Sequence, residues 1–303
     1  MTVDLRRLDH FLAIAESGSI NRAAETGTIS QAGLTKSLRI LEDQLGAKLF
    51  ERGPRGAVLT RQGRAFHRHA TLIANQRAAA VEAVRAEGEG VDVTIRIGIA
   101  PRWVLRTVLP PILARFAADE RRPRVHVLSG RKSWEMIQSL REGELDCLVA
   151  TPSELDDLEG IDARVVGTDP QGIVVRADHP LTAIQRPTLD DLGPYGWIVG
   201  PAETYFRRYI QSLYTLAGRN MPEPLITASS NVLILDTIAR SDLLGIATRR
   251  LIEVGHGDRI AMLSLRDQVR RETAILTRTA DLLPSTAHDL IASLAEALTD
   301  HDA

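Results

Sequence analysis

Residues 19–24 read SINRAA and residues 28–42 read TISQAGLTKSLRILE, and these two stretches decide the fold of the N-terminal part of the chain. The first predicts a short helix that begins at Ser19, a common capping residue, and ends at Gly27, where glycine can take a positive φ. The second predicts a longer helix capped by Ser30. Its buried stripe has leucines at offsets of four, three and four: Leu34, Leu38, Leu41 and Leu45. Two helices joined by such a turn predict a helix-turn-helix.

The polar side of the second helix carries residue types that reach base edges and phosphates. These residues are Gln31, Thr35, Lys36 and Arg39. Further DNA contacts are expected around the starts of the two helices, from Ser19, Asn21, Arg22, Ser30 and Gly33. A capped amphipathic helix with a solvated polar face is common in globular proteins, so a purely structural helix is the alternative.

The flanking segments favour the DNA-binding interpretation. A first helix can share the same small core through the apolar residues Leu5, Leu8, Phe11, Leu12 and Ala15. Residues 49–60 read LFERGPRGAVLT, which predicts two short strands around a Gly-Pro-Arg-Gly turn, as in a β-wing. Arg52 and Arg55 near its tip suit a phosphate backbone or a narrow minor groove, although solvated turn arginines are the alternative.

Residues 5–64 closely resemble the winged helix-turn-helix of the LysR-type transcriptional regulators. The segments that match that family's pattern in order and spacing are 11–19, 30–31, 41–52 and 59–63. One departure lies at Ala32-Gly33, where family members often carry proline and then alanine or serine. Because glycine costs a helix about 0.5–1 kcal/mol relative to alanine, we expect a looser start to the reading helix.

Residues 61–87 contain no proline and predict one long helix, which with a Glu-Gly-Glu-Gly joint forms a linker over residues 63–90. Its apolar stripe consists of Phe66, Ala70, Ile73, Ala80 and Val84. Such a stripe needs a cover, either a partner helix or the helix's own domain. The resemblance implies antiparallel pairing of this linker in a homodimer and usually a homotetramer, and it makes RNA polymerase a further possible partner.

Residues 91–303 alternate strands and helices, which predicts an α/β domain with parallel strands. A βαβαβ unit is expected from strands at 93–99, 125–128 and 146–150, with a helix over 104–118 broken or kinked at Pro110-Pro111 and another over 134–141. These residues resemble the family's effector-binding domain, itself similar to type 2 periplasmic solute-binding proteins. We therefore expect two Rossmann-like lobes joined by two crossovers, lobe I at 91–162 plus 268–303 and lobe II at 163–267, after a headpiece at 1–62.

An effector should bind between the lobes, where strands end and helix N-termini offer N–H groups to an anion. The loops there supply the expected effector-binding residues Pro101, Arg102, Trp103, Ser129, Arg131, Pro201, Thr204, Asn231 and Thr248. Family members often place a serine or threonine after the first strand, whereas this chain has Ala100, so Arg102 is expected to replace that hydroxyl. The predicted ligand is a small organic anion, such as an aromatic or unsaturated carboxylate. The alternatives are that Arg102 and Arg131 are only solvated and that Trp103 packs at the start of a helix.

Composition and motifs narrow the other possibilities. Residues 1–90 hold 13 Lys and Arg against 10 Asp and Glu, so this part carries +3 and the remainder of the −2 chain carries −5. No nucleophile elbow, P-loop, dinucleotide fingerprint or zinc-protease motif occurs, so we expect no enzyme. With Cys147 as the only cysteine and His67 and His69 on different helix faces, we expect no cofactor and no metal.

The chain has neither an N-terminal signal pattern nor a run of about 18 apolar residues, so a cytoplasmic protein with no membrane partner is expected. Two other functions stay open: a DNA-binding regulator without a ligand, and an exported solute receptor.

Overall fold

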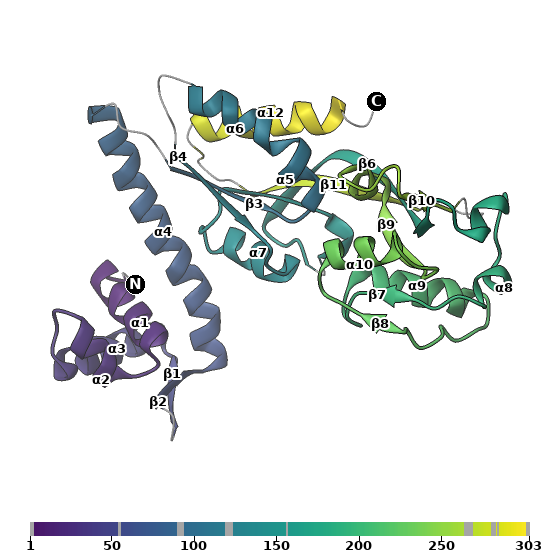
Figure 1. The fold of residues 1–303 in the computed structure, drawn as a ribbon. Helices are drawn as coiled ribbons and strands as arrows, with labels where there is room; N and C mark the ends of the chain where they lie inside the picture. The colour runs from purple at the N-terminus through teal and green to yellow at the C-terminus, as the bar shows by residue number, and fades with distance from the viewer. Residues whose placement is uncertain are drawn as a thin grey trace.

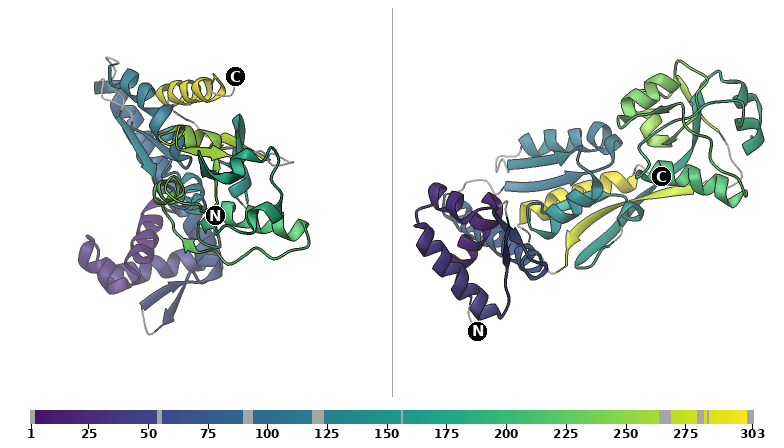
Figure 2. Two further views of the ribbon diagram at one scale, coloured as in Figure 1. Left: turned by 45° about the vertical axis from the view of Figure 1, so that its right-hand side comes forward. Right: turned by 90° about the horizontal axis from the view of Figure 1, so that it is seen from below.

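The computed structural model describes residues 3–53, 56–89, 94–118, 124–155, 157–263, 269–279, 283 and 285–300. It contains an N-terminal headpiece, a long helix α4 (Arg61–Glu89) and an α/β domain (Figure 1). The headpiece, lobe I and lobe II follow one another along the length of the molecule (Figure 2, right). α4 lies between the headpiece and lobe I.

The headpiece has the predicted three helices and wing: α1 (Leu5–Ser17), α2 (Ile20–Thr26), α3 (Gln31–Leu45), β1 (Phe50–Gly53) and β2 (Gly56–Leu59). The two strands pair antiparallel, with Phe50 opposite Leu59. The core combines the predicted leucine stripe with residues of α1 and α2: Leu8, Phe11, Ile14, Ala23, Leu34, Leu38, Leu41 and Leu49. The polar face of α3 is therefore left outside.

The helix ends agree with the predicted caps only in part. Ser30 caps α3 as predicted, because its Oγ accepts the Gly33 N–H at 3.2 Å. Ser19 occupies the N-cap of α2 but makes no capping bond through its side chain. The expected positive φ at Gly27 is wrong: it is extended (φ −99°), and its N–H donates to the Ala23 carbonyl at 3.1 Å. The left-handed turn instead lies at Gly18 (φ 64°), which ends α1.

Lobe I contains the predicted parallel unit. β3 (Thr94–Ile99) lies between β4 (Arg124–Ser129) and β5 (Cys147–Ala150), and both pairings are parallel. The expected helix over 104–118 is two helices, α5 (Arg102–Thr107) and α6 (Leu109–Ala118), with the break at Val108. Both prolines lie in the first turn of α6, where a missing N–H leaves no bond unmade.

The two faces of the lobe I sheet are covered by different helices, because successive strand residues point to opposite faces. Ile95, Ile97, Cys147 and Val149 pack against α5, α6 and α12 (Ser285–Asp300). Leu148 and its alternating neighbours pack against α7 (Ser133–Arg141). Figure 1 shows α6 and α12 side by side over one face of the sheet and α7 on the other.

Two long strands join the lobes. β6 (Ile161–Arg176) and β11 (Val269–Arg278) pair antiparallel, and β6 continues into lobe II, where it pairs with β9 (Gly245–Thr248) and β10 (Ile260–Met262). The result is one mixed seven-stranded sheet in the order β10-β6-β11-β5-β3-β4, with β9 on β6. One sheet thus runs through both predicted lobes, and the expected lobe boundary at residue 163 falls inside β6.

Lobe II wraps helices around the far half of β6. A two-stranded parallel sheet, β7 (Ile198–Val199) with β8 (Ile226–Thr227), adjoins it through a bridge between Trp197 and Leu244. The remaining helical segments of the described chain are α8 (Leu189–Leu192), α9 (Tyr205–Leu216), α10 (Asn231–Ile238), α11 (Arg249–Glu253) and the short 3-10 turns at Pro152–Glu154 and Pro180–Ala183. Ile173 and Val175 pack toward α9, and Val174 packs toward α10.

Candidate functional site

The outer face of α3 presents the predicted reading residues. Gln31, Lys36 and Arg39 are exposed, and Thr35 is half-buried with its Oγ1 donating to the Gln31 carbonyl at 2.9 Å. Arg39 approaches Asp43 only to 3.8 Å, with side chains 80% and 66% exposed, so water screens that pair. The cations of this face are therefore available to a polyanion.

The neighbouring α2 adds two exposed polar residues, Asn21 and Arg22. At the start of α3, a Cβ on Gly33 would lie 2.7 Å from Ile29 Cγ1, and Ile29 packs against the headpiece core. The glycine that departs from the family pattern is thus fitted to a close contact in the turn.

The wing is attached to the turn between α1 and α2. The Ala57 N–H donates to the Gly18 carbonyl at 2.9 Å, and a Cβ on Gly56 would lie 2.3 Å from the same oxygen. The structure describes Arg52 in backbone only, and Arg55 lies outside the described residues. The phosphate contacts of these two arginines stay predictions.

A buried carboxylate fixes the turn between α3 and the wing. Glu42, only 7% exposed, accepts the Leu49 N–H at 2.8 Å and pairs with Lys48 Nζ at 2.6 Å. Thr60 Oγ1 donates to the Lys48 carbonyl at 2.6 Å and accepts the Gly63 N–H at 2.9 Å. These bonds join α3, the wing and α4 into one unit.

α4 is held on both sides. Arg77 makes a bidentate pair with Asp9 of α1, at 2.8 and 2.9 Å. Asn75 Nδ2 donates to the Glu142 carbonyl, in the turn after α7, at 2.7 Å. α4 therefore connects the headpiece to lobe I through direct polar contacts.

The apolar stripe of α4 divides into two parts. Ala70 is buried and Phe66 half-buried against the headpiece, with the Phe11 and Phe66 rings 5.0 Å apart. Further along, three large side chains stay exposed in this single chain: Ile73 at 45%, Val81 at 49% and Val84 at 74%. The helix thus packs partly on its own headpiece and leaves an apolar strip uncovered.

The predicted effector-binding residues lie at several places on the two lobes. Pro101 caps α5 and Arg102 begins it with an exposed side chain, while Ser129 is exposed at the end of β4. In lobe II, Pro201 and Thr204 precede α9, and the Thr204 hydroxyl donates to the Pro201 carbonyl at 2.7 Å.

Three further predicted residues have distinct surroundings. Asn231 begins α10, and Thr248, which is 6% exposed, ends β9 opposite Gln171. Arg131 lines a hollow on lobe I whose other lining residues include none of the predicted effector-binding residues.

Trp103 forms a contact between the lobes. It is 5% exposed, and the guanidinium of Arg250 from α11 lies 4.5 Å from the ring centroid. Arg106 Nη1 also donates to the Val254 carbonyl at 3.1 Å. Such a cation over a tryptophan face is attractive. α5 of lobe I is therefore tied to the segment after β9 in lobe II.

Sequence reasoning missed a buried polar cluster on the crossover strands. Arg271 of β11 pairs with Glu154 of lobe I, and its guanidinium lies 4.6 Å and 4.7 Å from the rings of Tyr205 and Phe206 in lobe II. Ser133 Oγ donates to Glu154 at 3.1 Å. One arginine thus links both lobes. No local pattern indicates it, because Glu154, Tyr205 and Phe206 lie far from Arg271 in the sequence.

Two buried polar residues of β6 adjoin this cluster. Asp169, opposite Arg271, is 2% exposed, and its Oδ1 accepts the Arg250 N–H at 3.2 Å. Burial raises the pKa of Asp169, and its Oδ2 has no partner. Gln171 is 1% exposed, and neither Nε2 nor Oε1 of its amide has a hydrogen-bond partner. Unpaired buried groups of this kind are costly and mark places where a ligand or water can bind.

Other chemistry finds little support in the described part of the chain. It contains no group of three or more His, Cys, Asp or Glu able to hold a metal ion. No described helix is both long and apolar enough to span a bilayer. Burial raises the pKa of the Cys147 thiol to about 12, so this side chain is a core thiol.

The family models match both parts of the chain. Residues 5–64 match the bacterial regulatory helix-turn-helix protein model of the lysR family, and residues 88–299 match the LysR substrate binding domain. Among known proteins, the SDS degradation transcriptional activation protein of a Pseudomonas species is 35% identical over 273 residues, which cover 86% of this chain and 85% of that protein. The transcriptional regulator YdcI of Escherichia coli is 31% identical over 229 residues, 75% of this chain and 73% of that protein.

Solved structures agree on the fold. Full-length OxyR from Pseudomonas aeruginosa, 19% identical, superposes with a TM-score of 0.67 over 98% of this chain and 95% of its own. CbnR in complex with its target DNA is 20% identical and superposes with a TM-score of 0.61 over 99% of this chain and 100% of its own. With its helix-turn-helix headpiece and its two-lobed effector-binding domain, the chain belongs to the LysR family of transcriptional regulators, which bind DNA and are not enzymes.

Proposed function

We propose that the exposed face of α3 reads an operator in the major groove. The reading residues are Gln31, Thr35, Lys36 and Arg39, supported by Ser19, Asn21, Arg22, Ser30 and Gly33 at the helix starts, with Arg52 and Arg55 on the phosphate backbone. The observation that carries this proposal is the division of α3 into a buried leucine face and an exposed donor-rich face. Bidentate donors in such positions discriminate bases, and cations give affinity.

The test is a salt-titrated binding assay on DNA from upstream of the protein's own gene. Lys36→Ala should weaken binding to all sequences and reduce the salt slope by about 0.9, the value of one phosphate contact. Gln31→Ala should lose preference for the operator over random DNA. Arg208→Ala, which removes an exposed arginine of α9, is the matched control and should bind like wild type. Equal loss of affinity for all three variants would contradict the assignment.

The regulator acts as a homodimer or homotetramer paired through α4. The support is the uncovered strip of Ile73, Val81 and Val84, which a partner helix would bury. Val84→Glu should lower the sedimentation coefficient of the full-length protein, whereas Leu216→Glu, at a residue 85% exposed on α9, should leave it unchanged. An unchanged sedimentation coefficient in Val84→Glu would mean that the subunits pair through another surface. RNA polymerase is the partner that such a DNA-bound assembly would meet at a promoter.

The effector is a small organic anion bound at the boundary between the lobes. Arg102 at the start of α5, whose guanidinium pairs with no described residue, would hold its carboxylate. Thr204 and Thr248 lie on the lobe II side, and Gln171 offers an unpaired amide. Pro101, Trp103, Ser129, Pro201 and Asn231 complete the proposed surroundings. The effector can shift the equilibrium between two arrangements of the lobes only by the difference between its affinities for them.

A library of small aromatic and unsaturated carboxylates, screened for altered operator binding, supplies the ligand for the test. Arg102→Ala should lower the affinity for the carboxylate that the screen identifies. Gln171→Leu, which removes the unpaired amide, should change ligand preference while the stability of the protein is kept or improved. Unchanged affinity in Arg102→Ala would overturn direct contact with that arginine.

A further inference from the structure

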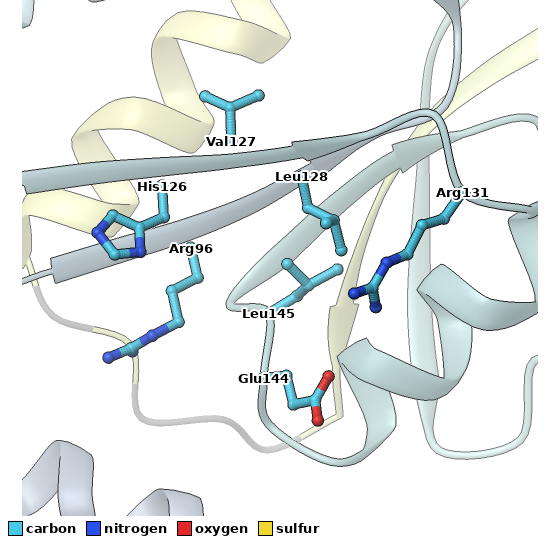
Figure 3. A pocket seen from close by; sticks show the side chains of 7 residues that line it. All are labelled: Arg96, His126, Val127, Leu128, Arg131, Glu144 and Leu145. Carbon is cyan, nitrogen blue, oxygen red and sulfur yellow. The ribbon is translucent and has the colours of Figure 1, made fainter.

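Lobe I carries an open hollow of about 410 Å³ on the face of the sheet that also holds α7, beside the edge strand β4 (Figure 3). Its volume is within the range of small-molecule sites. The residues that line it include Arg96, His126, Leu128, Arg131, Glu144 and Leu145. The hollow is formed by lobe I alone, so it is separate from the boundary between the lobes.

The charges of the hollow lie at its two ends. Arg96 and His126 are directly paired across β3 and β4, so their side chains share one face. Arg131 reaches in from the loop after β4, and Figure 3 shows Leu128 and Leu145 between it and the pair Arg96 and His126. A molecule lying here would meet an arginine at each end and leucine in the middle.

We propose that this hollow is a second small-molecule site, for a short dicarboxylate. From His126 to Leu128, which share one face of β4, the strand advances roughly 7 Å at about 3.3 Å per residue, and this span suits a six-carbon chain with a carboxylate at each end. Glu144 also lines the hollow, and one of its carboxylate oxygens accepts a hydrogen bond from Ser139 Oγ at 2.8 Å. Its charge opposes anions, so it favours a ligand whose two carboxylates stay at the ends.

The floor of this site is also the support of α4. Glu144 and Leu145 continue the turn of Glu142 and Gly143, whose carbonyl at Glu142 receives Asn75 of α4. Gly143 has a φ of 73°, and a Cβ there would lie 3.1 Å from Leu72 Cδ1 of α4.

The same turn is also held by β11, because Arg278 Nη1 donates to the carbonyls of Leu140 and Leu145, each at 2.5 Å. An occupant pressing on Leu145 therefore acts on the turn that holds α4, and α4 holds the headpiece through Arg77 and Asp9. The site is thus placed to influence the headpiece independently of the effector.

The test measures binding of three matched probes to the full-length protein by calorimetry: adipate, hexanoate and 1,6-hexanediol. Adipate should bind roughly fivefold more tightly than hexanoate, the size of one exposed charge pair, and the diol should not bind measurably. Arg131→Gln should reduce the affinity for adipate to that for hexanoate. Glu144→Gln, which keeps an acceptor for Ser139, should strengthen adipate binding several-fold.

Opposite effects of these two variants would separate a binding role from a structural one. Equal affinities of adipate and hexanoate, or adipate binding lost in Arg102→Gln and kept in Arg131→Gln, would overturn the site. The second result would move the dicarboxylate to the boundary between the lobes. Arg208→Gln is the control for a general loss of positive charge.

Hydrogen exchange on the same protein tests the connection to α4. Adipate should slow exchange in peptides from residues 61–89, and Asn75→Ala should abolish that change while adipate still binds. Slowed exchange that persists in Asn75→Ala, or none in wild type, would overturn the route through the turn after α7.

Discussion

Glu42→Ala removes the carboxylate that fixes the turn between α3 and the wing. In the native headpiece this side chain is 7% exposed and accepts the Leu49 N–H at 2.8 Å, while its second oxygen pairs with Lys48 at 2.6 Å. Alanine cannot replace the acceptor. The Leu49 N–H then stays buried without a partner, because Leu49 is 1% exposed and packed in the headpiece core.

The cost follows from these two contacts. A hydrogen bond to a charged group is worth about 1.5–3 kcal/mol, and leaving a buried donor unpaired costs a similar amount. The Lys48 pair adds under ~1 kcal/mol, because the lysine side chain is 72% exposed. We therefore expect the headpiece to lose about 2–3 kcal/mol. Glu42→Gln keeps an acceptor and should lose about 1 kcal/mol.

Hydrogen exchange of the full-length protein is the assay, because all three tryptophans, Trp103, Trp134 and Trp197, lie in the effector domain and fluorescence does not report on the headpiece. A loss of 2–3 kcal/mol speeds exchange of the slowest amides in residues 5–60 by roughly 30- to 150-fold, with effector-domain peptides unchanged. Asp43→Ala, whose carboxylate is 66% exposed, should stay within about 0.5 kcal/mol of wild type. Headpiece exchange within twofold of wild type in Glu42→Ala would refute the reasoning.

Three further predictions test other parts of the structure. Gly63→Ala places a Cβ 1.9 Å from the Leu49 carbonyl oxygen, so circular dichroism should show a headpiece destabilised by about 1–3 kcal/mol, and an unchanged melting curve would contradict that close approach. Burial raises the pKa of the Cys147 thiol to about 12, so a thiol reagent at pH 8 should label the unfolded chain and spare the native one, and fast native labelling would show that the thiol is not buried. Burial raises the pKa of Asp169, so the native state holds this proton more tightly than the unfolded chain, and stability should fall as pH rises from about 3.9 toward the higher native pKa. Urea titrations of Asp169→Asn should lose that part of the slope, and identical pH dependence in variant and wild type would exclude Asp169 as its source.

Local sequence was sufficient wherever the deciding interactions lie within a few residues of one another. The leucine stripe of α3, the cap at Ser30 and the uninterrupted helix α4 depend on helical periodicity and on capping chemistry, both of which act over one or two turns. The parallel unit of β3, β4 and β5 follows from the same local reasoning, because a strand, a helix and a strand of these lengths have essentially one right-handed arrangement.

Residue type alone misjudged positions whose surroundings come from distant segments. Gly27 needed no positive φ, and Gly33 is explained by its approach to Ile29, which packs in the headpiece core. For Trp103 the sequence left both a ligand contact and a packed side chain open, and the structure places Arg250 of the other lobe over its ring. No local pattern announces such contacts, since each depends on how two separate elements pack.

The sequence by itself determined the family, the order of the domains and the buried faces of α1 and α3, since periodicity, caps and motif spacing are properties of neighbouring residues. Only the tertiary structure decided that one sheet runs through both lobes, because β6 pairs with a strand about a hundred residues away. It also decided that Arg271 links the lobes and that a turn of lobe I supports α4. These contacts form between segments far apart in the chain, where packing and the burial of polar groups select the partner, and periodicity carries no information about it.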